Sequence, residues 1–139
     1  MTILKAGEKE LKIKYGYEAT LKTRILTKLS KMSESMKTTA EAEDSTSKAE
    51  DMLLFIPEFL LVGLQKHHSE EYGFNYKTEQ GKEEALNKVY ELLDDYFEDE
   101  NNDITSLFNQ LQNEMFENGF LAKMFRNEIA NAEQNLNIN

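Results

Sequence analysis

The sequence predicts a mainly α-helical protein, a bundle of about five helices with a small N-terminal β-hairpin. Three observations indicate this fold class. Apolar residues alternate with polar ones only near the N-terminus, and from residue 17 onward they recur every three or four positions. One segment, 52–64, is apolar on every side, which is typical of the central helix of a bundle. The 139 residues are the length of a single domain.

The hairpin is predicted over residues 2–15, where Leu11, Ile13 and Tyr15 alternate with lysines after a glycine turn. Residues 38–46 are all Thr, Ala, Glu, Asp or Ser, so we expect a mobile loop there. The Asn-rich residues 134–139 are expected to fray. The predicted helices cover residues 17–36, 47–68, 79–98, 103–117 and 119–133.

Local signals indicate where these helices begin, pack and bend. Ser47 and Glu50 have the spacing of a capping box, and Asp103 stands where an N-cap is expected. Pro57 lacks a backbone donor, so we expect a kink in the second helix. The first helix is expected to turn one apolar stripe toward the core, made of Leu21, Ile25, Leu29, Met32 and Met36.

Charge is distributed unevenly along the chain. Residues 1–38 hold nine Lys or Arg and four Asp or Glu, a net charge of +5, and the remainder carries −15. Residues 39–139 are so acidic that they repel phosphate groups, which argues against nucleic-acid binding. The acids are expected to form a solvated surface, and the basic N-terminal end is a candidate to pair with the acidic body of a neighbouring copy.

Other features bear on the compartment. The N-terminus lacks the pattern of a secretory signal, and the absence of cysteine suits a reducing compartment. The longest apolar stretch, 52–64, is interrupted by Pro57 and Glu58 and is too short to span a bilayer. We therefore expect a soluble, cytoplasmic protein with no membrane partner.

Two groups of residues resemble metal sites only in composition. His67 and His68 precede two glutamates, but adjacent side chains on a helix point about 100° apart and rarely share one ion. The acidic residues 95–103 lack the glycine and the closing glutamate of a calcium loop, because Ile104 and Gln110 stand at those positions. We expect no metal at either place.

No motif predicts catalysis. The chain has no cysteine, no glycine-rich phosphate loop and no serine in a nucleophile turn. Its many carboxylates belong to polar helix faces, where water keeps them ionised. The expectation is a protein that is not an enzyme and needs no cofactor.

The segment 52–64 leaves two interpretations open. Ten of its thirteen residues are large and apolar, so it is expected to be packed on every side as a central helix. Alternatively, short neighbouring helices leave one side uncovered, as a groove for an apolar segment of a partner. The six methionines suit a surface that adapts to its ligand, although methionine is also common in cores.

The order of these features resembles a known family. A basic hairpin ends in Lys14-Tyr15-Gly16-Tyr17, the apolar helix runs into His67-His68, and an acidic helix follows over 84–98. The chain then closes with Leu107, Glu114 and the string Glu117-Asn118-Gly119-Phe120. Over residues 10–125 this pattern is similar to the small tail assembly chaperones of siphophages that infect Gram-positive bacteria.

This resemblance implies a homo-oligomeric protein of the host cytoplasm that coats the tape measure protein before the tail tube polymerises. The tail tube protein is a second candidate partner. If the apolar segment 52–64 forms a groove, the expected partner contacts are Phe55, Phe59, Leu60, Leu61, Leu64, Phe116, Phe120 and Met124. Self-association is expected between Lys5, Lys9, Lys12 and Lys14 of one copy and Asp94, Asp95 and Glu98 of the next.

A function of another class also fits the sequence. Residues 89–122 contain nine acids and no Lys or Arg, which suits a protein that mimics nucleic-acid charge and blocks a DNA-binding partner. Such a mimic is expected to align its carboxylates on one exposed face, with little apolar groove beside them.

Overall fold

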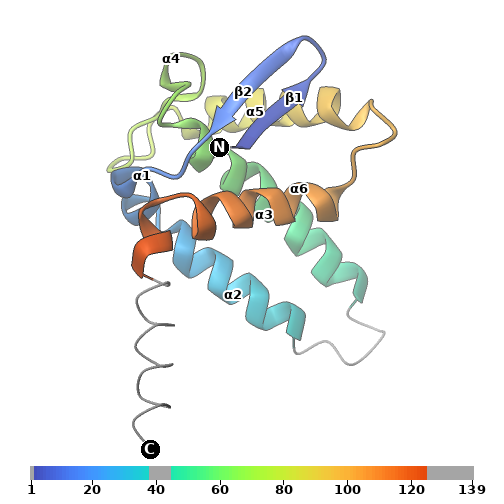
Figure 1. Ribbon diagram of the computed structural model, residues 1–139, viewed down its shortest axis with the longest axis horizontal. Coiled ribbons are helices and arrows are strands. Elements are labelled where there is room, and N and C mark those ends of the chain that lie inside the picture. Colours follow the sequence, from blue (N-terminus) through green and yellow to red (C-terminus); the bar gives the residue numbers. More distant parts are fainter. Residues whose placement is uncertain (1, 38–44, 125–139) are drawn as a thin grey trace, which may run out of the picture.

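The computed structural model describes residues 2–37 and 45–124, and it is mainly helical with one N-terminal hairpin (Figure 1). The predicted fold class is confirmed at this level. The loop expected at 38–46 falls largely outside the described residues, as do the tail at 134–139 and most of the helix predicted over 119–133. The elements are β1 (Thr2–Ala6), β2 (Lys9–Ile13), α1 (Tyr17–Lys22), α2 (Ile25–Lys37), α3 (Ser45–Leu64), α4 (Ser69–Tyr72), α5 (Lys82–Phe97) and α6 (Ile104–Glu117), and a helical segment begins at Phe120.

The hairpin is antiparallel and tightly turned. Thr2 pairs with Ile13 and Ala6 with Lys9, which leaves Gly7 in the turn with a positive φ of 59°. Its inner face is apolar, with Leu4, Ala6, Leu11 and Ile13 buried. The hairpin therefore has a packed side and a solvent side, as the alternation predicted.

The hairpin is fastened to α6 by an unexpected polar contact. The backbone nitrogen of Thr2 donates a hydrogen bond of 2.6 Å to Oε1 of Glu114. Glu114 is only 3% exposed, although the sequence suggested that the carboxylates belong to solvated faces. A buried carboxylate needs such a donor, and this bond links β1 to α6.

The predicted helix over 17–36 is divided into α1 and α2. Arg24 has a positive φ of 58°, which ends α1 and starts α2 in a new direction. The Thr23 hydroxyl supports this end by donating a hydrogen bond of 2.5 Å to the carbonyl of Ala19. Non-glycine residues rarely adopt this conformation, and no glycine or proline marked the break in advance.

The second predicted helix has different ends. α3 begins at Ser45, two residues before the predicted start at Ser47, and it ends at Leu64 instead of reaching 68. At this end the Gln65 amide donates hydrogen bonds to the carbonyls of Leu61, at 3.1 Å, and Tyr72, at 2.7 Å. These bonds allow the chain to turn into α4. α3 runs through Pro57 without a break, and the kink there remains a prediction.

α3 is the centre of the molecule, and α2, α5, α6 and β2 all pack against it (Figure 1). Glu58, on this helix, receives hydrogen bonds from Lys28 of α2, at 2.5 Å, and from Lys82 at the start of α5, at 2.7 Å. Burial raises the pKa of Glu58, but the two lysines lower it by more, so its net pKa lies below the ordinary value. This carboxylate thus joins three helices.

Two further observations complete the fold. Asp103 is the N-cap of α6, as predicted, and its carboxylate accepts a hydrogen bond of 2.8 Å from the backbone nitrogen of Ser106. This bond and one from the Ser106 hydroxyl lower the pKa of Asp103. No helix in residues 2–37 and 45–124 is long and apolar enough to cross a membrane.

Candidate partner-binding surface

Most of the residues predicted to contact a partner are in the core instead. Five of the eight are buried on α3, with exposed fractions between 0% and 8%: Phe55, Phe59, Leu60, Leu61 and Leu64. The ring of Phe59 lies 5.0 Å from Tyr15 and 6.0 Å from Phe108, so the hairpin side and α6 both cover it. The expectation of a groove along these residues is therefore wrong for this structure, and α3 is a central helix.

The exposed apolar side chains of α3, among its described residues, lie before Phe55. Leu53 and Leu54 are 51% and 57% exposed, whereas the side chains from Phe55 to Phe59 turn inward or pair with lysines. The apolar segment thus changes from surface to core within a few residues. Neither leucine was among the predicted contact residues.

The other predicted contact residues lie at the far end of the described chain. Phe116, in the last turn of α6, and Phe120 are partly buried and pack against the core, and Met124 is 48% exposed. Phe120 also meets the ring of Tyr17 edge-on, with 5.1 Å between the ring centroids. Met124 is therefore accessible, and a partner contact at any of these three residues stays a prediction.

Two residues of α1 extend this surface. Tyr17 is 67% exposed and Leu21, one helical turn later, is 45% exposed. Leu21 was expected in the core stripe of a longer helix, but the break at Arg24 turns α1 away from the axis of α2 and leaves Leu21 outside. We call the set Tyr17, Leu21, Phe120 and Met124 the Phe120 surface.

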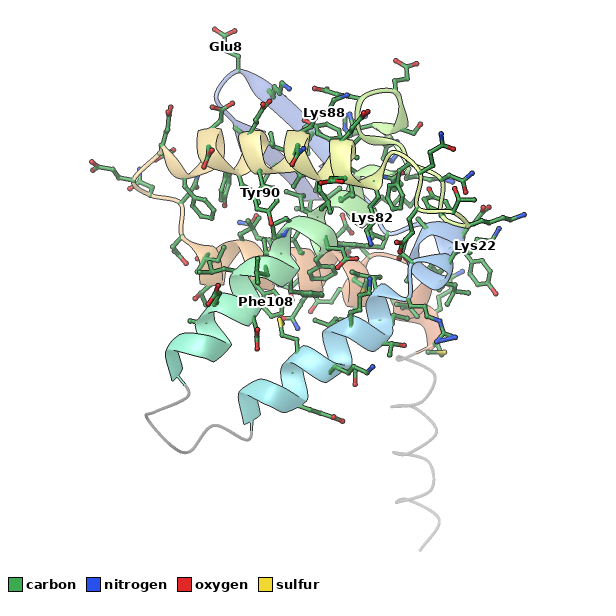
Figure 2. The ribbon with its side chains drawn as sticks, turned by 180° about the vertical axis from the view of Figure 1, so that it is seen from behind. Glu8, Lys22, Lys82, Lys88, Tyr90 and Phe108 are labelled. Carbon is green, nitrogen blue, oxygen red and sulfur yellow. The ribbon has the colours of Figure 1, made fainter. Side chains whose placement is uncertain are left out.

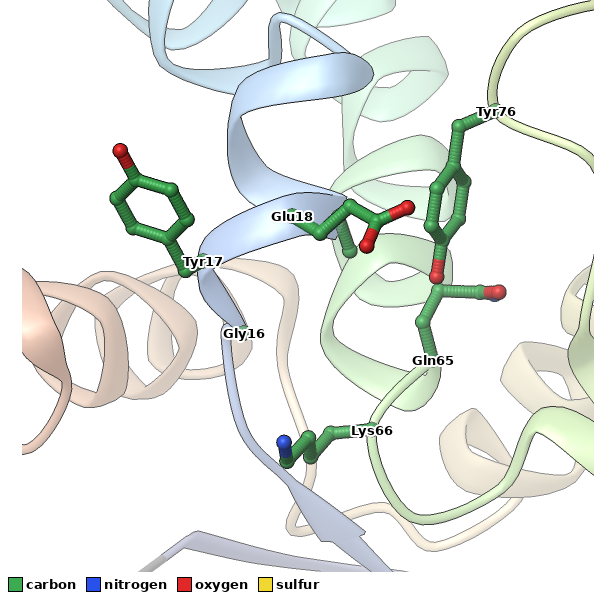
Figure 3. Close-up of a pocket in the computed structure, with 7 residues that line it drawn as sticks. Gly16, Tyr17, Glu18, Gln65, Lys66 and Tyr76 are labelled. Carbon is green, nitrogen blue, oxygen red and sulfur yellow. The ribbon is translucent and has the colours of Figure 1, made fainter.

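A pocket of about 410 Å³ adjoins the Phe120 surface. Figure 3 shows Tyr17 and Glu18 on opposite sides of the start of α1, with Glu18 directed toward Tyr76 and Gln65. Burial, and then the charge of Glu18, raise the pKa of Tyr76, so this hydroxyl stays protonated. The remaining lining residues are Gly16, Ala19 and Lys66. The lining thus combines a carboxylate, a lysine and a tyrosine hydroxyl.

Three of the seven residues predicted to join two copies are neighbours within one chain. Lys5 lines a pocket of about 350 Å³ together with Asp95 and Glu98, because β1 packs against α5. Lys9 makes an ion pair of 2.9 Å with Glu71 of α4. Lys12 and Lys14 have exposed side chains, as does Asp94. Pairing between copies stays a prediction, but the hairpin already contacts α4 and α5 of its own chain.

His68 has a structural partner. Its Nε2 accepts a hydrogen bond of 2.9 Å from the backbone nitrogen of Lys12 in β2. Burial lowers the pKa of His68, and the charge of His67 lowers it further, which favours the neutral ring that can accept this bond. Within the part of the chain that the structure describes, no three His, Asp or Glu side chains are grouped as metal ligands.

Comparisons with family models, with curated proteins and with solved structures find no match to this chain. The candidate function therefore depends on the sequence pattern and on the surfaces described above.

Proposed function

We propose that this chain is a phage tail assembly chaperone, which binds an apolar helical segment of the tape measure protein and keeps it soluble before the tail tube polymerises. The observation that carries the proposal is the Phe120 surface, where the exposed ring of Tyr17 meets the ring of Phe120. Leu21 and Met124, each four residues further along its helix, are also exposed. The resemblance of the sequence to this class of chaperone supports the proposal.

The Phe120 surface fits what a chaperone of an apolar chain requires. A long apolar helical chain aggregates unless its exposed faces are covered. An amphipathic helix binds through side chains spaced three or four residues apart, and Tyr17 with Leu21 and Phe120 with Met124 have this spacing on the receiving side. Methionine side chains such as that of Met124 adapt to ligands of different shape, as a protein that coats a long chain requires.

Co-expression with a tape measure fragment tests the proposal. The native chain is expected to keep the fragment in the soluble fraction. Tyr17→Glu and Met124→Glu are expected to lose this effect, because each places a charge where an apolar contact forms. Both residues are at least 48% exposed, so the variants should fold, which thermal melting would verify.

Tyr90→Glu is the matched control. Tyr90 is 45% exposed and lies on α5, outside the Phe120 surface, and Figure 2 shows it on the side of that helix opposite Lys88. This variant is expected to solubilise the fragment as well as the native chain does. A native chain that leaves the fragment insoluble, or Tyr17 and Met124 variants that solubilise it fully, would contradict the proposal.

One observation favours the second candidate, a mimic of nucleic-acid charge. Glu84 and Glu91 on α5 and Glu98, the C-cap residue of this helix, recur every seven residues and are all exposed, so they lie on one side of the helix. Lys88 interrupts the charge of this side, and the exposed Tyr90 and Phe97 belong to the same helix. A mimic would displace DNA from a basic partner protein, and charge-neutral variants of these three glutamates would fail to do so.

A further inference from the structure

We infer that the Phe120 surface selects an amphipathic helix whose apolar stripe is bordered by acidic residues. This inference rests on the proposed function, and it specifies the sign of the charge that the partner segment carries beside its apolar stripe. It follows from three exposed cations in a chain whose net charge is −10, which we call the border of the surface: two are close to its residues in the sequence, and one lines the adjoining pocket.

The three cations come from different parts of the chain. Arg24 follows Leu21 at the end of α1, and Lys123 precedes Met124. Lys66 lies beside Gly16 on the side of the pocket that Tyr17 also lines (Figure 3). The packing there is close, since a Cβ atom built on Gly16 would lie 3.6 Å from Cδ of Lys66.

All three cations have exposed side chains, and none forms an ion pair with a residue in 2–37 or 45–124. The nearby acids are already engaged. Glu18 pairs with Lys22 at 3.1 Å, and Glu117 has an interaction within the chain. The border of the Phe120 surface therefore carries a local positive charge.

The acidic residues of the chain are concentrated elsewhere. α5 and the turn after it hold Glu91, Asp94, Asp95, Glu98, Asp99 and Glu100. In Figure 1, α5 lies at the top of the molecule, whereas α1 and the segment after α6 lie at the left, below the level of α5. The Phe120 surface, where apolar side chains from α1 and the C-terminal segment meet, therefore has a basic border. This border attracts a partner helix with acidic flanking residues and repels one with basic flanking residues.

Fluorescence anisotropy with the full chain and designed helical peptides tests the inference. The peptides share one leucine stripe and differ only in flanking residues, which are Glu, Gln or Lys. At low salt the Glu-flanked peptide is expected to bind about tenfold more tightly than the Lys-flanked one, as a few exposed charge pairs would give. High salt should remove this difference, because the flanking charges are exposed to solvent.

The double variant Arg24→Glu/Lys123→Glu is expected to reverse the preference, and Lys31→Glu, an exposed cation on α2, is its control with the native preference kept. Equal affinity for the three peptides would overturn this inference and leave the proposed function standing. Failure of every peptide to bind would overturn the use of the Phe120 surface, and with it both proposals.

Discussion

The hydroxyl of Tyr15 donates a hydrogen bond of 2.9 Å to the carbonyl of Phe59, and the two rings lie 5.0 Å apart. Burial raises the pKa of Tyr15 well above its ordinary value, and the charge of Glu114 adds to this effect, so the hydroxyl remains a donor. One turn later on α3, the carbonyl of Gly63 accepts a hydrogen bond of 2.9 Å from the Lys14 nitrogen. The chain that leaves β2 is thereby held directly against the central helix.

This contact depends on a glycine. A Cβ atom at position 63 would lie 2.8 Å from Cγ2 of Ile13 and 3.1 Å from the ring of Tyr15. Gly63→Ala is therefore expected to destabilise the protein by about 1–3 kcal/mol through overpacking. This loss appears even though alanine favours a helix by about 1 kcal/mol over glycine. Urea unfolding gives the free energy.

A double-mutant cycle identifies the cause. In the background of Ile13→Ala, which removes the nearest clashing atom, Gly63→Ala is expected to cost about 1 kcal/mol less than it does alone. A stabilising Gly63→Ala, or a cost that does not depend on residue 13, would contradict the close approach of β2 and α3.

The burial of α3 leads to a second prediction. Leu60→Ala and Leu61→Ala are each expected to cost roughly 2–5 kcal/mol, because both side chains are fully buried. Leu54→Ala, on the same helix but 57% exposed, is expected to change the free energy of unfolding by less than about 0.5 kcal/mol. Near-native stability of both core variants would restore the groove interpretation of this helix.

The hydrogen bond from Lys12 to His68 predicts a dependence on pH. The folded pKa of His68 lies below the ordinary 6.5, so the unfolded chain binds the proton more readily. The stability contributed by this group is complete above the unfolded pKa and is lost as the pH falls through the lower folded pKa. The free energy of unfolding is thus expected to decrease between about pH 7.5 and pH 5.5.

Two variants separate this effect from other titrations. His68→Gln is expected to flatten the dependence in this range, whereas His67→Gln, which changes an exposed neighbour, should leave most of it. Identical pH profiles for His68→Gln and the native chain would show that His68 does not hold the hairpin.

Local patterns predicted the elements well. The alternation of Leu11 and Ile13 predicted the hairpin, and Asp103 predicted the start of α6, because both signals act over a few residues. The break at Arg24 could not be predicted in this way. A positive φ at an arginine has no sequence signature, because non-glycine residues of any type adopt it only rarely.

The site was harder to predict than the fold. Apolar character placed Phe59 and Leu60 correctly on a helix, but it does not tell a covered face from an open one. Gly63 was the available signal, since a glycine inside an apolar helix indicates close approach of another backbone. Leu21 was missed as a surface residue because its exposure follows from the unpredicted break at Arg24.

Photo-cross-linking to a tape measure fragment tests the central claim most directly. A photoreactive phenylalanine analogue would replace Tyr17 or Phe120 in the Phe120 surface, and Tyr90 on α5 as the control position, one at a time in the full chain. The account predicts cross-linked product from positions 17 and 120 and little from position 90. Cross-linking from position 90 alone, or from none of the three while the fragment stays soluble, would contradict it.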